Sequence, residues 1–107
     1  MIRHIVLFTA REKQHRQTIL EGLSLLKNIP DCLHLEIGVN TRHDPVSEIT
    51  PDFVVYGEFE SDEQLAAFKL HDLYQRSIDI VRPLRDKRIA ADFDSPTDPT
   101  DIALEEH

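Results

Sequence analysis

The stretch Met1-Ile-Arg-His-Ile-Val-Leu-Phe8 decides the fold, because it has the composition of a β-strand and is apolar on both of its faces. Successive side chains of a strand point to opposite faces. One face therefore carries Ile2, Val6 and Phe8, and the other carries Ile5 and Leu7. An antiparallel strand with one face in water has polar residues on that face, so this pattern predicts a sheet that is covered on both sides.

The chain also predicts two helices. Apolar residues recur at helical spacing from Arg11 to Asn28, and Pro30-Asp31 ends that helix. Ser61-Asp-Glu-Gln64 has the form of a capping box and begins a second helix, which extends to Pro83. The His71-Asp72 region could divide this second helix into two pieces.

Three further strands are predicted over residues 32–39, 53–60 and 87–93. A polar loop that contains two prolines joins the first two of them over residues 40–52. The element order is therefore βαββαβ, which predicts one α+β domain over residues 1–94 with a ferredoxin-like fold and a four-stranded antiparallel sheet.

This order has a consequence for assembly. Crossovers that join parallel neighbours are right-handed, which places both helices on one face of the sheet. The other face has no cover from its own chain, although its expected residues in the two central strands are apolar or aromatic: Ile5, Leu7, Val54 and Tyr56. A large exposed apolar patch indicates an interface, and two-fold pairing of like faces closes the assembly. We therefore expect a homodimer whose sheets pack face to face as a dimeric α+β barrel.

Composition excludes several classes of function. The chain of 107 residues has a formal net charge of −8, and it has no basic stripe to bind a nucleic acid. Half of the excess lies in residues 95–107, which read as an acidic disordered tail. No apolar run is long enough to cross a membrane, the start has no signal-peptide layout, and the single Cys32 cannot form an internal disulfide. These features predict a cytoplasmic protein without a membrane or nucleic-acid partner.

Several short pieces stand in a characteristic order and spacing along the chain: Met1 to Phe8, Phe59-Glu-Ser61, Leu65-Ala-Ala-Phe68, His71 with its flanks, and Ala91-Asp-Phe93. On these pieces, residues 1 to about 94 resemble the stress-responsive dimeric α+β barrel family, known as Dabb. The resemblance implies a homodimeric barrel, an association with stress, and a small-molecule pocket between the sheet and the helices.

The resemblance also implies candidate catalytic residues. A plant polyketide cyclase of this family uses a histidine in its first strand, a second histidine in a His-Pro-x-His segment, and an aspartate near the end of its last strand. His4 matches the first histidine and Asp92 matches the aspartate, whereas the segment reads His71-Asp72-Leu73-Tyr74 in this chain. A tyrosine is a poor base at neutral pH, so the resemblance does not carry the cyclase's general base over to this sequence.

His4 is the central candidate for a site. It lies on the predicted helix-facing side of its strand, beside Val6, and Val55 and Phe59 would adjoin it if the first and third strands pair. A desolvated histidine could bind a carbonyl group or move a proton. Alternatively, it is a core histidine that is hydrogen-bonded to Asp92 or Tyr74.

Phe68, His71 and Tyr74 follow one another at helical spacing and could form a lid over His4. In the alternative reading, Phe68 packs in the core and His71 caps a helix end. The predicted binding set comprises His4, Val6, Val55, Phe59, Phe68, His71 and Tyr74, with His4 and Asp92 as catalytic candidates.

Metals and cofactors are not expected. His34 and Glu36 share a strand face, but two ligands without a third at defined spacing do not make a metal site. The sequence has no phosphate loop, nucleophile elbow or dinucleotide fingerprint. Cys32 has no catalytic context, and three further histidines are predicted at the surface: His15, His43 and His107.

Three functions remain open at this level. The leading one is a homodimeric protein that binds a small apolar or aromatic molecule in a largely apolar pocket near His4, with no established reaction. The second is an enzyme, either a polyketide cyclase or a cofactor-free monooxygenase. The third is an interaction module that only dimerises.

Overall fold

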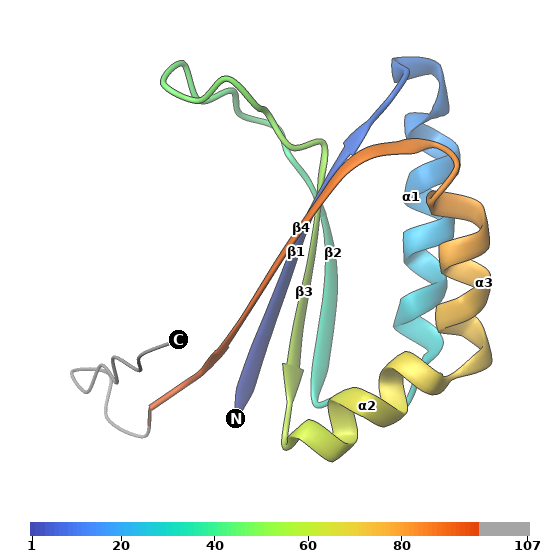
Figure 1. Cartoon of the computed structure of the whole chain (residues 1–107), viewed down its shortest axis with the longest axis vertical. Helices are drawn as coiled ribbons and strands as arrows, with labels where there is room; N and C mark the ends of the chain where they lie inside the picture. The colour runs from blue at the N-terminus through green and yellow to red at the C-terminus, as the bar shows by residue number, and fades with distance from the viewer. Residues whose placement is uncertain (97–107) are drawn as a thin grey trace.

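The structure, a computed structural model, describes residues 1–96, and it has two layers. A four-stranded sheet forms one layer, and all the helices pack against one of its faces (Figure 1). The strands are β1 (Ile2–Ala10), β2 (His34–Val39), β3 (Phe53–Phe59) and β4 (Arg85–Asp94). The helices are α1 (Arg16–Ser24), α2 (Asp62–Leu70) and α3 (Asp72–Val81), with short 3-10 turns η1 (Lys13–His15) and η2 (Leu25–Asn28). Residues 97–107 of the predicted tail, including His107, lie outside the described part.

The sheet has the order β2-β3-β1-β4, and every neighbouring pair is antiparallel. This confirms the ferredoxin-like fold with a four-stranded antiparallel sheet. The expectation that each crossover joins parallel neighbours is wrong, because a third strand lies between the two strands of each βαβ unit. β3 fills the space between β1 and β2, and β1 fills the space between β3 and β4.

The register of the central strands decides which side chains face the helices. β1 pairs with β3 from Ile2 opposite Phe59 to Phe8 opposite Phe53. Alternate residues of both strands are therefore buried under the helices, and His4 is among them. The core combines these residues with apolar residues of the helices and their connections: Ile2, Val6, Phe8, Ile19, Leu23, Leu26, Ile29, Phe53, Val55, Phe59, Leu65, Phe68 and Val81.

Local hydrogen bonds explain where the helices of the second half begin and end. The Ser61 hydroxyl accepts a hydrogen bond from the Gln64 backbone N–H at 3.2 Å, as the capping box predicts. In a capping box the Gln64 side chain would accept from the N–H of Ser61. It instead accepts from the N–H of Glu60, one residue earlier, at 2.7 Å. The predicted break is confirmed at His71, which is extended and caps α3 by accepting from the Leu73 N–H at 3.0 Å.

Some predicted boundaries are wrong by a few residues. The first helix begins at Arg16 rather than Arg11, because Glu12 is extended and the Arg11 N–H donates to the Leu84 carbonyl. β2 begins at His34 rather than Cys32, because the Cys32 N–H closes a turn onto the Pro30 carbonyl. Residues 40–52 form a loop, as predicted.

The face of the sheet opposite the helices has an apolar centre and a polar end. Ile5, Leu7 and Val54 are half-buried within the single chain, and Ile89 and Phe93 of β4 are about half exposed on the same face. We call this surface the open face.

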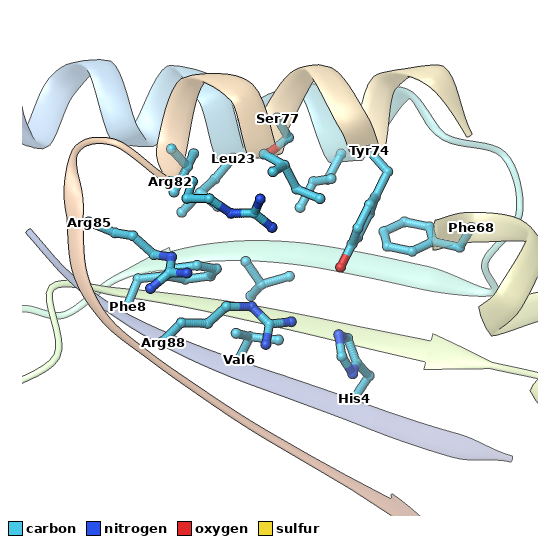
Figure 2. Close-up of a pocket in the computed structure, with 14 residues that line it drawn as sticks. His4, Val6, Phe8, Leu23, Phe68, Tyr74, Ser77, Arg82, Arg85 and Arg88 are labelled. Atoms are coloured by element: carbon cyan, nitrogen blue, oxygen red, sulfur yellow. The ribbon is translucent and has the colours of Figure 1, made fainter. Parts of the chain in front are cut away.

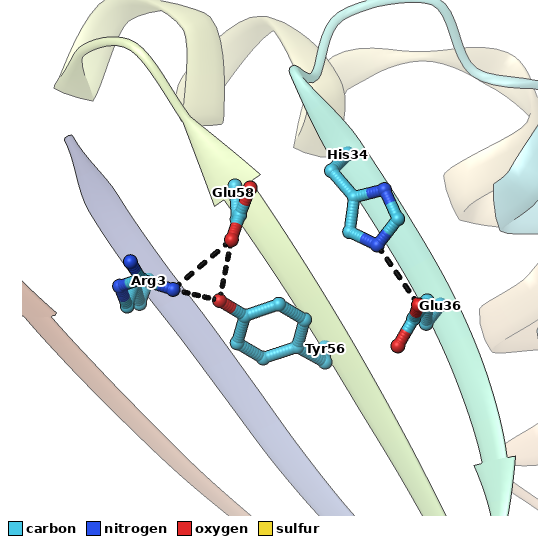
Figure 3. Close-up of polar contacts among 5 residues, drawn as sticks. All are labelled: Arg3, His34, Glu36, Tyr56 and Glu58. Carbon is cyan, nitrogen blue, oxygen red and sulfur yellow. Dashed lines mark hydrogen bonds and ion pairs between the residues drawn. The ribbon is translucent and has the colours of Figure 1, made fainter.

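At the polar end of the open face, the Tyr56 hydroxyl donates to Glu58 at 2.6 Å (Figure 3). Arg3 donates to the Tyr56 hydroxyl and to Glu58, the latter at 3.0 Å. The hydrogen bond to Glu58 raises the pKa of Tyr56, because an ionised phenol would lose that bond. The central part of the open face therefore matches the predicted uncovered surface, with a paired polar cluster at its end.

Candidate functional site

A cavity of about 320 Å³ lies between the helix-facing side of the sheet and helix α3 (Figure 2). Its sheet wall comes from alternate residues of β1 and β3 together with Arg85 and Arg88 of β4, and its roof comes from α1, η2, α2 and α3. The lining residues are His4, Val6, Phe8, Leu23, Leu26, Val55, Phe68, Tyr74, Ser77, Ile78, Val81, Arg82, Arg85 and Arg88. Cavities that hold small organic ligands begin at about this volume.

His4 forms part of the cavity floor and is only 3% exposed. Its Nδ1 is hydrogen-bonded to the Asp92 carboxylate, which stands beside it because His4 and Asp92 are partners in the β1–β4 register. A carboxylate only accepts hydrogen bonds, so Nδ1 carries the proton. In the neutral ring, Nε2 is then the atom with a free lone pair, and it makes no hydrogen bond within residues 1–96. Asp92 touches His4 but does not line the cavity.

An aromatic cluster closes the His4 end of the cavity. Phe59 is fully buried and packs edge-on against His4, with ring centroids 6.0 Å apart. Phe68 packs edge-on against Phe59 at 5.1 Å and against Tyr74 at 5.6 Å. The Tyr74 hydroxyl points down from α3 toward the His4 ring (Figure 2). Together these rings fix the positions of the two polar groups, His4 and Tyr74.

The opposite end of the cavity carries three arginines, which the sequence reading did not single out. Arg82 follows the end of α3, and Arg85 and Arg88 belong to the first half of β4. All three guanidinium groups are directed toward the cavity (Figure 2). The signal in the sequence was the segment Arg82-Pro-Leu-Arg-Asp-Lys-Arg88, which holds four of the twelve basic residues of an acidic chain.

The structure therefore brings most of the predicted binding set together. His4, Val6, Val55, Phe68 and Tyr74 line the cavity. Phe59 and His71 do not, because Phe59 lies behind His4 in the core and His71 serves as the cap of α3. The predicted lid on one helical face is wrong for the same reason, since His71 interrupts the helix between Phe68 and Tyr74. The wall is also less apolar than expected, because of the arginines.

The other singled-out residues lie away from the cavity. The exposed side chains of His34 and Glu36 on β2 contact each other, with His34 Nε2 3.1 Å from a carboxylate oxygen of Glu36 (Figure 3). No group of three or more histidine, cysteine, aspartate or glutamate side chains stands close enough to hold a metal ion among residues 1–96. His43 is exposed and His15 is half-buried. Burial, and secondarily the charge of Asp31, raises the pKa of the half-buried Cys32 thiol.

Within residues 1–96, no helix is both long and apolar enough to cross a bilayer.

The fold and the cavity together define a class: ferredoxin-like α+β domains with a pocket between the sheet and its helices and an uncovered sheet face. The chain belongs to the stress responsive A/B barrel domain family, Dabb, whose sequence model matches residues 2–95. The comparison with curated proteins finds no match.

Solved structures share the fold at low sequence identity. A dimeric ferredoxin-like protein of unknown function from Thermobifida fusca is 23% identical, with a TM-score of 0.70 over 86% of this chain and 88% of that one. A second such protein, from a Jannaschia species, is 18% identical, with a TM-score of 0.74 over 87% and 97%. A third, named as an antibiotic biosynthesis monooxygenase, is 16% identical, with a TM-score of 0.72 over 88% and 97%.

Proposed function

We propose that this protein is a cytoplasmic homodimer that binds a small organic molecule in the cavity between its sheet and helix α3. The cavity carries this proposal. His4 and Tyr74 point into the cavity at one end and three arginines at the other, with apolar walls between them. An apolar space with a few convergent polar groups is the usual form of a ligand site.

The open face supports the homodimer. Ile5, Leu7, Val54, Ile89 and Phe93 would be removed from water if two such faces paired. A standard interface buries roughly 800 Å² per partner, and apolar burial contributes about 25 cal/mol per Å² before the costs of association. The Thermobifida and Jannaschia proteins are both described as dimeric. Their pairing is consistent with this use of the open face.

Native mass spectrometry of the purified protein tests both parts of the proposal. We expect the mass of two chains, with additional mass from a bound small molecule that extraction releases. A Val6→Phe variant should lose that additional mass, because the larger ring fills the cavity. Val39→Phe makes the same substitution on the same side of the sheet, at an exposed position outside the cavity, and should retain the ligand. A ligand-free protein that binds no member of a metabolite library would contradict the binding function, and a single-chain mass would contradict the dimer.

A second candidate function is catalysis by proton abstraction. The observation that favours it is the pairing of His4 with Asp92, which fixes the tautomer and leaves Nε2 as the base. A base of this kind could remove a proton from a carbon next to a carbonyl group, and the resulting carbanion can react with dioxygen without a cofactor. The structural neighbour named as a monooxygenase is consistent with such chemistry.

Oxidation of anthrone tests this second function. Deprotonated anthrone consumes one dioxygen and yields anthraquinone and one water, which absorbance follows directly. We expect acceleration over buffer that His4→Ala abolishes and Asp92→Asn reduces, because the asparagine no longer stabilises a charged ring. Val39→Phe serves as the control of unchanged rate. Equal rates for the unsubstituted protein and His4→Ala would exclude His4 as the base.

A further inference from the structure

We propose that the ligand is an amphipathic organic anion, whose acidic head group binds Arg82, Arg85 and Arg88 while its apolar body lies toward His4 and the aromatic cluster. The inference rests on the proposed binding function and gives that function a substrate class. We call these three residues the arginine cluster.

An irregularity in the pairing of β1 with β4 brings two members of the arginine cluster, Arg85 and Arg88, to the same side of the sheet. Arg88 lies opposite Phe8 in the β1–β4 register, and Arg85 lies opposite Ala10. Two residues of β4 therefore lie between these pairs, where β1 has only one. This irregularity is a β-bulge, and bulges change the direction in which a side chain points. In a regular strand, side chains three residues apart face opposite sides of the sheet. The bulge therefore turns both Arg85 and Arg88 toward the helices.

Within residues 1–96, no carboxylate neutralises the arginine cluster. None of its three members forms an ion pair with a carboxylate of residues 1–96, and its one side-chain hydrogen bond runs from Arg85 to the Asp86 carbonyl at 3.4 Å. By contrast, Arg3 and Arg16 of the same chain each pair with a carboxylate. Three unpaired cations around one cavity repel one another, and they do so in a chain whose net charge is −8. A bound anion would relieve this repulsion.

The arrangement of the lining residues also indicates which kind of anion would fit the cavity. Guanidinium groups bind planar oxyanions such as carboxylates through paired hydrogen bonds. Beyond the arginine cluster the walls are apolar, from Val6 and Val55 to Phe68. A head group held at the arginines would direct an apolar body along these walls to His4 (Figure 2). The ligand is therefore an organic acid with an apolar or aromatic body, rather than a free inorganic anion.

Two fluorescent probes with the same ring system test the charge requirement. 8-Anilinonaphthalene-1-sulfonate carries an anionic head, and N-phenyl-1-naphthylamine is the same body without it. We expect fluorescence titration of the purified protein to show at least tenfold tighter binding of the anionic probe, because charge-assisted hydrogen bonds are worth that factor or more. Inorganic phosphate at equal concentration should not displace it.

Substitutions locate the effect. Arg82→Gln and Arg88→Gln change exposed side chains, so both variants should fold, and each should weaken the anionic probe about tenfold while leaving the neutral probe unchanged. Arg76→Gln removes the same charge from an exposed position of α3 outside the cavity and should alter neither probe. Circular dichroism confirms the fold of each variant.

The outcomes separate the inference from the function beneath it. If both probes bind equally and the arginine substitutions change neither, the cavity binds ligands but the anion preference is wrong. If phosphate displaces the anionic probe, the arginine cluster takes free inorganic anions and the amphipathic class is wrong. If neither probe binds, both the proposed ligand-binding function and this inference fail.

Discussion

Replacing Gly57 by alanine should destabilise the fold, because it disturbs the packing of the sheet next to His4. Gly57 lies opposite His4 in the β1–β3 register and is buried. A Cβ atom added there would stand 2.7 Å from a ring carbon of Phe59 and 3.2 Å from Leu35. The Phe59 ring would have to retreat by about 0.7 Å to reach 3.4 Å, where ordinary van der Waals contact begins. It has little room to do so, because Phe59 is fully buried against Phe68.

Two opposing terms set the size of the effect. Overpacking a core costs about 1–3 kcal/mol. Replacing a strand glycine with alanine recovers roughly 0.5–1 kcal/mol of backbone entropy. Taken at the middle of each range, the two terms together lower the free energy of unfolding by about 1.3 kcal/mol. This corresponds to a decrease in Tm of roughly 5–10 °C for a domain of this size. The displaced ring should also shift Phe68 and Tyr74, which pack on it in sequence.

The assay is thermal unfolding by circular dichroism at a fixed protein concentration, with Gly38→Ala as the matched control. A Cβ at Gly38 would meet only Val54, at 3.8 Å, which is ordinary contact. That variant should keep or slightly raise its Tm. If Gly57→Ala and Gly38→Ala have the same Tm, the close packing of Phe59 over Gly57 is not a constraint and the reasoning is refuted.

Three other substitutions or conditions give independent tests. Leu7→Asp places a charge at the centre of the open face, so sedimentation velocity should show single chains where the unsubstituted protein shows dimers, and a persistent dimer would point to a different interface. Ser61→Ala removes the cap of α2 and should lower the free energy of unfolding in urea by about 1 kcal/mol, whereas no change would mean that the cap is not stabilising. Because burial raises the pKa of Cys32, the folded chain keeps that proton to higher pH than the unfolded chain. Its contribution to stability should be full below the ordinary thiol pKa and should be lost as the pH rises through the raised value. Iodoacetamide should accordingly alkylate Cys32 more slowly in the folded protein than in urea, and equal rates would contradict the raised pKa.

The fold could be predicted from the sequence because its determinants are local. The alternation around Val6 and the cap at Ser61 report strands and helices directly, and the break lies at His71, whose side chain caps the following helix. Boundaries were less accurate where a distant partner decides them. The hydrogen bond from Arg11 to Leu84 delays the first helix, and it joins residues more than seventy positions apart.

The site could be predicted only in part. His4 and Val55 were found because strand alternation assigns them to the helix side. Tyr74 was found through the resemblance to the family. The arginine cluster was missed because the direction of Arg85 depends on the bulge, and a single sequence does not show where a strand pair takes up an extra residue. Phe59 was wrongly included in the predicted binding set, because a residue on the same strand face as His4 need not line the cavity.

The bulge also sets how β4 tolerates changes in length. Between Arg88 and Asp94, losing one residue would exchange the two faces, so that side chains such as Ile89 would enter the cavity and Arg88 would enter the open face. Between Arg85 and Arg88 the same deletion would remove the bulge and straighten the strand, and it would leave both arginines on the helix side, because they would then be two residues apart. Natural losses of one residue in this strand should therefore gather in that short interval, and a homologue with one residue fewer there should still have both arginines on the cavity side.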